Sequence, residues 1–288
     1  AIFNIKAGIT ICQILKNTHN YIMTKKEIDE VLEQLNIAKL DPNHTGIKQL
    51  IFDKNDNISF KPVKIYNLGY GNPKVNGEIL LYEEIKSKIN TLFDVGARDD
   101  VYYVTEPHTQ YHLFEPDPQN FAKLEKKIKA LVDGNIDVTP NQFGLGSSNE
   151  KLPFYDKINT NGNGTFLKGV NQKPDEVIEV RRLDTYAKEH NISYIDFLKI
   201  DVEGFEMEVI KGAGELLHNI DYVQFEYGGD YKKANVSIRD VLQYLINYGF
   251  MGFFILSSNG LVNVQRNLKD HYMMCNFLAA RKGDDIQD

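Results

Sequence analysis

The chain has 288 residues, of which 42% are hydrophobic and 25% are charged, so we expect one large domain with a sizeable core, or one domain with a small appendage. No apolar stretch approaches the ~20 residues of a membrane span, and no signal-peptide pattern is visible. The net charge of −7 disfavours nucleic acid as a partner. Cys12 and Cys275 lie far apart in apolar surroundings, which favours buried free thiols and a cytoplasmic location.

The first 65 residues differ in pattern from the rest, and we interpret them as an N-terminal extension that forms a cap or lid. Residues 9–15 and 25–40 carry helical periodicity. Residues 47–52 and 58–65 bracket a turn rich in Asn and Asp, which predicts a β-hairpin. Because the chain begins at Ala rather than Met, we expect it to be part of a longer, multidomain protein.

Residues 66–288 alternate between short apolar runs and helical patterns, which is typical of an α/β domain with a mostly parallel sheet. The last two apolar runs predict an antiparallel pair at a sheet edge. The predicted strands cover residues 91–95, 110–114, 136–138, 142–145, 152–155, 177–182, 194–200, 222–225, 250–256 and 271–279. The predicted helices cover residues 77–89, 119–131, 207–214 and 236–248.

One apolar run, from Tyr194 to Ile200, predicts a buried strand that ends abruptly at Asp201, Glu203 and a glycine. Open α/β sheets bind their ligands at the carboxyl ends of such strands. A carboxylate at a buried strand end is costly unless it is hydrogen-bonded or close to a cation. Asp201 is therefore either a ligand-binding or catalytic residue, or a cap for the helix that follows.

Two earlier strand ends carry further acidic residues. Asp94 precedes Gly96, and a glycine turn at a strand end lets a ligand approach the backbone closely. Glu115 ends the second strand, about 20 residues past the first, where an acid can bind both hydroxyls of a ribose. The alternative is a carboxylate favoured by the start of the next helix. The spacing favours the ribose interpretation.

Four segments occur in an order that resembles the FkbM family of S-adenosylmethionine-dependent methyltransferases. They are residues 94–97 (Asp-Val-Gly-Ala), 114–116 (Phe-Glu-Pro), 182–184 (Arg-Leu-Asp) and 198–206 (Leu-Lys-Ile-Asp-Val-Glu-Gly-Phe-Glu). Lys211-Gly212-Ala213 and Phe225-Glu226 extend the resemblance. It covers roughly residues 75–230 and implies a seven-stranded, Rossmann-like methyltransferase sheet with helices on both faces. The small helical and hairpin extension lies outside it.

The resemblance implies that the first glycine turn binds the methionine end of S-adenosylmethionine and that the acid of the second strand binds its ribose. The cofactor-binding residues expected on this basis are Glu78, Asp94, Gly96, Ala97, Arg98, Phe114, Glu115, Pro116, Gln142, Phe143 and Asp201. Where the family has Gly-Ala-Asn, an apolar residue and then Gly, this chain has Gly96-Ala97-Arg98-Asp99-Asp100. Helix packing at this turn must therefore differ.

Methyl transfer to oxygen is an in-line displacement at a sulfonium, and the acceptor hydroxyl needs a base or a metal ion to lose its proton. Asp201 is the first candidate for the base or for orienting the substrate, and Glu226 is the second. The two together could instead hold a divalent cation. Glu203 is a candidate for binding the substrate, and Lys199 for an ion pair that supports Asp201.

The leading hypothesis is an O-methyltransferase acting on a hydroxyl of a small molecule or glycan, in particular a sugar. The polar loop at residues 159–165 either closes over such a substrate or is simply flexible. The substrate-binding candidates are Tyr70, Asn163, Thr165 and Tyr227. One alternative is an RNA ribose 2′-O-methyltransferase, for which Lys269 is the late lysine. The other is a cofactor-binding module without activity, in view of the departure at Arg98.

Overall fold

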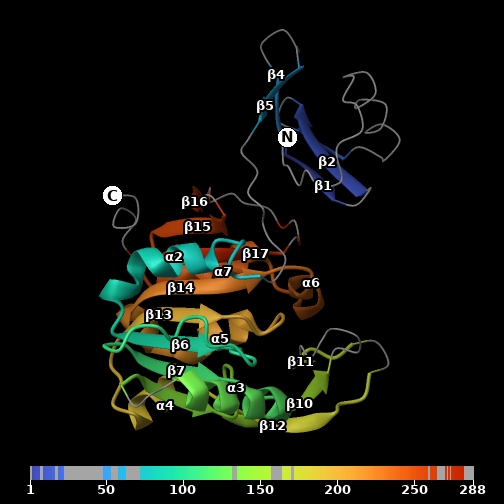
Figure 1. The fold of residues 1–288 in the computed structure, drawn as a ribbon. Helices are drawn as coiled ribbons and strands as arrows, with labels where there is room; N and C mark the ends of the chain where they lie inside the picture. Colours follow the sequence, from blue (N-terminus) through green and yellow to red (C-terminus); the bar gives the residue numbers. More distant parts are fainter. Residues whose placement is uncertain are drawn as a thin grey trace.

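The computed structural model describes most of residues 72–281 and, nearer the N-terminus, the backbone of five strands (Figure 1). The described ranges are 72–131, 135–156, 164–169, 172–258, 260–264 and 274–281, with residues 270 and 272. Within these ranges no helix has both the length and the apolar character needed to cross a membrane.

The five N-terminal strands form an antiparallel sheet in the order β3-β2-β1-β4-β5. Their bounds are β1 Ile2–Lys6, β2 Ile9–Lys16, β3 His19–Ile22, β4 Lys48–Phe52 and β5 Ile58–Pro62. The predicted hairpin is confirmed, because β4 pairs with β5 and Leu50 lies opposite Phe60. The helical interpretation of residues 9–15 is wrong: β2 pairs with a strand on each side, and its β-branched residues favour extended backbone. The helix predicted over residues 25–40 lies outside the described residues.

An eight-stranded sheet forms the centre of the remaining chain, in the order β16-β15-β17-β14-β13-β6-β7-β8 (Figure 1). Its strands are β6 Thr91–Val95, β7 Gln110–Phe114, β8 Asp137–Asn141, β13 Ile195–Ile200, β14 Ile220–Tyr227, β15 Gly252–Ser257, β16 Gly260–Asn263 and β17 Cys275–Ala280. The strands from β14 to β8 run parallel, so their carboxyl ends share one edge. All six residues of the central β13 are buried, which explains its nearly continuous apolar sequence.

The last strands do not follow one another across the sheet. β17 runs antiparallel between β14 and β15, and β16 forms the edge as a hairpin with β15. The predicted antiparallel pairing of β15 with β17 is confirmed, but the edge predicted for this pair is formed by β16. This added strand gives the sheet one strand more than the seven expected. In the β14–β17 register Glu226 lies opposite Asn276, which brings the segment before β17 to the carboxyl end of β14.

Helices cover both faces of this sheet, as the alternation of strands and helices predicts. α2 Glu78–Ile85 and α3 Pro118–Leu131 pack on one face through residues such as Leu81 and Leu124. α4 Leu183–Glu189, α5 Glu206–Ala213 and α7 Ile238–Asn247 pack on the other. Shorter segments are η1 Lys86–Lys88, η2 Gly214–Asn219 and α6 Asp230–Ala234.

A separate four-stranded sheet, in the order β11-β10-β12-β9, follows β8 in the chain. Its strands are β9 Gly144–Leu145, β10 Glu150–Asp156, β11 Gly164–Thr165 and β12 Glu176–Arg181. The strands predicted over residues 152–155 and 177–182 are confirmed as the antiparallel pair β10 and β12. The strand predicted over residues 142–145 belongs to this sheet and not to the third strand of the main one.

Candidate active site

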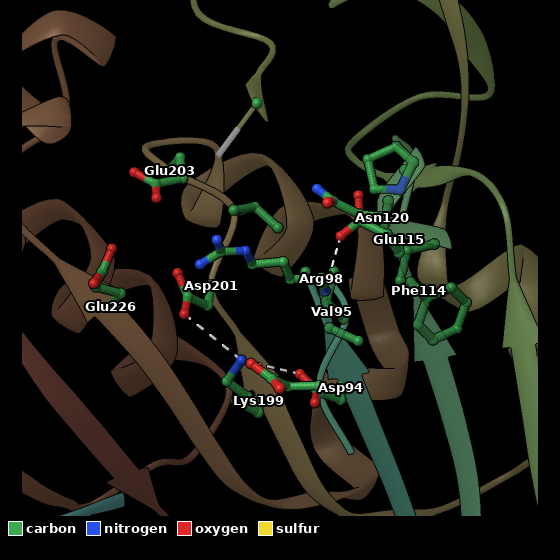
Figure 2. Close-up of a pocket in the computed structure, with 18 of the residues that line it drawn as sticks. Asp94, Val95, Arg98, Phe114, Glu115, Asn120, Lys199, Asp201, Glu203 and Glu226 are labelled. Carbon is green, nitrogen blue, oxygen red and sulfur yellow. Dashed lines mark hydrogen bonds and ion pairs between the residues drawn. The ribbon is translucent and has the colours of Figure 1, made fainter. Parts of the chain in front are cut away.

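A cavity of about 290 Å³ lies at the carboxyl ends of the parallel strands, at the lower end of the range for small-molecule sites. Figure 2 shows Glu115 and Phe114 at one end of it, Glu226 and Glu203 at the other, and Arg98 between them. Of the predicted cofactor residues, those that line it are Glu78, Asp94, Gly96, Ala97, Arg98, Phe114, Glu115, Pro116, Phe143 and Asp201. Gln142 is exposed and is not among the lining residues.

The glycine turn after β6 packs directly against the end of β13. Gly96 has a φ of 84°, and a Cβ built on it would lie 1.8 Å from the backbone oxygen of Asp201. The amides of Gly96 and Ala97 both donate to the carbonyl of Phe114, at 2.9 and 3.1 Å. The main reason for glycine at position 96 is therefore the close approach of the Asp201 backbone, which leaves no room for a Cβ. The sequence alone did not reveal this reason.

Glu115 is 6% exposed at the end of β7, and backbone amides already fix its orientation. Its two oxygens accept hydrogen bonds from the amides of Arg98 and Asp117, each at 2.8 Å. Burial raises the pKa of Glu115 to about 7, although these two hydrogen bonds oppose the rise. A carboxylate has about four acceptor sites, so Glu115 retains capacity for further hydroxyl donors.

Lys199 forms a buried ionic group with the acids on either side. Its Nζ lies 3.1 Å from Asp94 Oδ1 and 3.6 Å from Asp201 Oδ2. Burial lowers the pKa of Lys199, but the charges of Asp94 and Asp201 outweigh it, so the pKa is raised and the ammonium persists. The ion pair predicted between Lys199 and Asp201 is thus present, with Asp94 as a closer partner.

Three carboxylates gather where β13 and β14 end. Asp201, Glu203 and Glu226 each offer an oxygen, and these oxygens lie within 4.8 Å of one another. Glu203 has a φ of 55°, an uncommon left-handed conformation for a residue other than glycine. Burial raises the pKa of Glu226 well above its usual range, and the neighbouring charges of Asp201 and Glu203 raise it further.

Glu206, the last residue of the family motif, shapes the turn that carries two of these acids. One of its oxygens accepts hydrogen bonds from the amides of Val202 and Gly204, at 3.2 and 3.1 Å. Burial raises the pKa of Glu206 to about 8 despite these bonds. Glu206 therefore fixes the backbone between Asp201 and α5. The sequence did not predict this role, although Glu206 lies within the family motif at residues 198–206.

Glu78 lines the cavity but serves as a junction between elements. Its oxygens accept hydrogen bonds from Asn76 Nδ2 at 2.5 Å, Gln224 Nε2 at 2.7 Å, Tyr103 Oη at 2.9 Å and Asn276 Nδ2 at 3.1 Å. These donors come from the segment before α2, the loop after β6, and strands β14 and β17. Four donors use the acceptor capacity of the carboxylate, so Glu78 fixes the wall of the cavity.

The predicted substrate residues are dispersed. Thr165 lines the cavity and donates a hydrogen bond to the carbonyl of Glu203 at 3.0 Å. Tyr227 is buried outside the lining, where its hydroxyl donates to Asp270 at 3.0 Å. Tyr70 and Asn163 lie outside the described residues. Lining residues that sequence reasoning missed are Pro73, Val95, Asp100, Tyr102, Tyr103, Asn120, Gly144, Leu145, Phe154, Gly164, Phe166, Val202 and Met274. The adjacent tyrosines after the glycine turn were the available signal.

An open α/β sheet with β17 inserted antiparallel, a glycine turn after its first strand and a buried acid after its second define a Rossmann-like methyltransferase. The family model for the methyltransferase FkbM domain matches residues 94–251, more than half of the chain, so the protein belongs to that family. The resemblance found in the sequence is confirmed, and S-adenosylmethionine is the cofactor that the family and the fold indicate.

Several relatives share this domain at low identity. The 2-O-methyltransferase NoeI of Sinorhizobium fredii is 24% identical over 201 residues, which cover 62% of this chain and 79% of NoeI. The hexuronic acid methyltransferase AglP of Haloferax volcanii is 27% identical over 167 residues, which cover 58% of this chain and 65% of AglP. A crystal structure of a methyltransferase FkbM from Methylobacillus flagellatus aligns with a TM-score of 0.44 and 16% identity, over 66% of this chain and 43% of that one.

Proposed function

We propose that the protein transfers a methyl group from S-adenosylmethionine to a hydroxyl of a small molecule or glycan, in particular a sugar. The observation that carries this proposal is the position of Asp201, whose carboxylate lies at the end of β13 in the same cavity as Glu115 and the glycine turn. The names of NoeI and AglP, which refer to O-methylation and to a hexuronic acid, support a sugar hydroxyl as the acceptor.

The lining residues fit the cofactor. The turn at Gly96 carries no side chain, since a Cβ there would clash with the Asp201 backbone, so a ligand can approach the turn's backbone closely. Glu115 retains acceptor sites for the two hydroxyls of a ribose. Asp94, Gly96, Ala97 and Arg98 would hold its methionine end, and Phe114, Pro116 and Phe143 its adenine. When bound, the cofactor supplies an electrophilic methyl group on a sulfonium.

The chain's own residues then have to orient a hydroxyl and accept its proton. Asp201 is the first candidate for the base, because rigid β13 holds it and Lys199 fixes its side chain at 3.6 Å. Glu226 is the second candidate, because it lies near the end of the neighbouring strand β14 and lines the same cavity. Glu203 would orient the acceptor, and Arg98, whose side chain points toward Asp201 in Figure 2, would balance charge.

A divalent cation is the alternative to a carboxylate base. Asp201, Glu203 and Glu226 offer oxygen ligands within 4.8 Å of one another, a donor set that suits Mg²⁺, Mn²⁺ or Ca²⁺. Such an ion would lower the pKa of the acceptor hydroxyl.

The decisive experiment measures cofactor binding and methyl transfer separately. We expect calorimetry to show binding of S-adenosylhomocysteine, and tritium-labelled S-adenosylmethionine to label methyl glycosides, with each assay repeated in EDTA and in excess Mg²⁺. Binding without transfer to any hydroxyl acceptor would contradict the proposal and favour a module that binds cofactor only. Loss of transfer in EDTA, restored by Mg²⁺, would identify the metal in place of the simple base.

A further inference from the structure

The cavity has a second half that the cofactor residues do not occupy. The cofactor half is lined by Glu115 after β7 and by Phe143 after β8, whereas the second half is lined by Glu226 of β14 and by Met274 just before β17. Met274 lies just past the end of β14, because a Cβ built on Gly228 would be 3.6 Å from its Cα. The acceptor half is therefore bounded by the ends of β13 and β14 and by the segment that precedes β17.

Two large apolar side chains remain exposed in this cavity. Tyr102 is 40% exposed and Met274 is 44% exposed, and both belong to the lining. Among the residues that the structure describes, no aromatic ring contacts the ring of Tyr102. Exposed apolar surface inside a concave polar site is typical of a ligand contact.

The backbone beneath Tyr102 is held firmly on the acceptor side. The neighbouring Tyr103 is buried and donates its hydroxyl to Glu78 at 2.9 Å. Glu78 in turn binds Gln224 of β14 and Asn276 of β17. The Tyr103 ring also lies with its centroid 5.9 Å from Lys199 Nζ. Tyr102 is thus presented on a fixed support next to the strand that carries Asp201.

We infer that Tyr102 and Met274 form an acceptor platform that binds the C–H face of a sugar ring, and that this sugar is uncharged rather than a uronic acid. The inference rests on the proposed function and names its substrate class. A pyranose has an apolar C–H face and a rim of hydroxyls, so it matches an exposed aromatic face beside carboxylates. The platform sets the position of the ring, and the three acids face its hydroxyls.

The acidic residues that line the second half of the cavity disfavour binding of an acidic sugar. Asp201, Glu203 and Glu226 line it, and the lining cations Lys199 and Arg98 each face a carboxylate (Figure 2). A uronic acid would bring another negative charge to this group, and like charges at close range repel strongly when partly buried.

The test compares matched acceptors and matched variants in the full chain. The acceptors are methyl glycosides of hexoses, each paired with its uronic acid, for example methyl glucoside with methyl glucuronide. We expect kcat/KM for the neutral member to exceed that for the uronide at least about tenfold. Equal or better turnover of the uronide would overturn the inference about charge.

The variants test the platform itself. Tyr102→Ala should raise KM for the neutral glycoside about tenfold, with kcat and S-adenosylhomocysteine affinity within about twofold of wild type. Tyr102→Phe should keep the wild-type KM, and so should Tyr194→Ala, which removes a 45% exposed tyrosine outside the cavity. Glycoside turnover that is insensitive to Tyr102→Ala contradicts the platform alone. Failure of the wild type to methylate any hydroxyl acceptor contradicts the proposed function first.

Discussion

Glu115 illustrates how burial at a strand end sets the charge of a single residue. Its carboxyl is nearly inaccessible, and burial raises its pKa to about 7. The folded protein therefore holds this proton more tightly than the unfolded chain, and the contribution of Glu115 to the free energy of unfolding falls as the pH rises toward 7. Glu115→Gln should accordingly remove this part of the pH dependence of stability, which urea unfolding of both proteins at pH 5 and pH 8 would measure.

The same pKa predicts how cofactor binding depends on pH. If Glu115 accepts hydrogen bonds from a ribose, binding favours its ionised form, so S-adenosylhomocysteine affinity should rise about tenfold between pH 6 and pH 8. Glu115→Gln should remove this dependence, and Glu115→Ala should weaken binding by about 1–3 kcal/mol. Calorimetry across this pH range checks both. Wild-type affinity in the alanine variant would remove Glu115 from the ribose site.

Asp201 is the residue on which the chemistry depends in our proposal. Asp201→Asn keeps the shape and removes the charge, and we expect turnover to fall by roughly a hundredfold or more, as when a positioned base is lost. S-adenosylhomocysteine affinity and the unfolding midpoint should change much less. Glu226→Gln is the matched comparison from the next strand end. Near-normal turnover in Asp201→Asn would make Asp201 a structural cap and Glu226 the base to examine.

At the scale of elements, the packing of the glycine turn against β13 joins the two halves of the site. The Gly96 turn contacts the Asp201 backbone, and Glu206 holds the turn that follows Asp201. Any displacement at Gly96 therefore moves both the backbone near the cofactor and the proposed base. We therefore expect substitutions at Gly96 and Asp201 to have effects on stability that do not add.

Gly96→Ala tests that coupling. Positive φ costs an L-residue about 1–2 kcal/mol and overpacking about 1–3 kcal/mol more, so we expect a loss of about 2–5 kcal/mol of stability. Gly260→Ala is the control: its φ is 103°, but a Cβ there meets nothing within 4 Å, so only the first cost applies. Urea unfolding of both variants gives the comparison. Equal losses would show that the Asp201 backbone yields readily to the added methyl.

At the scale of the whole molecule, the N-terminal strands are separate in sequence from the family domain, whose match begins at residue 94. We predict that a chain beginning near Ile65 folds and binds S-adenosylhomocysteine with nearly unchanged affinity, because the predicted cofactor residues all lie beyond it. Turnover of the acceptor should fall, since we expect the extension to shape acceptor access. Calorimetry and labelled methyl transfer measure the two effects. A folded, truncated chain that no longer binds cofactor would contradict this division.

The sequence determined the parts of this protein that depend on local pattern. The run from Tyr194 to Ile200 and the alternation of strands with helices were sufficient for the α/β class. The short motifs at the strand ends were sufficient for the family and for about half of the cavity lining. Each of these features has a short period or a fixed spacing, so neighbouring residues carry the whole signal. The helical interpretation of residues 9–15 was wrong because pairing with two neighbouring strands overrode a weak apolar pattern.

Only the tertiary structure decided which distant residues meet. The insertion of β17 between β14 and β15 brings Asn276 and Gln224 onto Glu78, and through Tyr103 this network supports Tyr102 in the cavity. The tertiary structure also shows that the Asp201 backbone occupies the space that a Cβ on residue 96 would need. The contacts of Glu78 with Gln224 and Asn276, and of Gly96 with Asp201, join residues more than a hundred positions apart. Their partners are chosen by strand order and register, which no local pattern encodes.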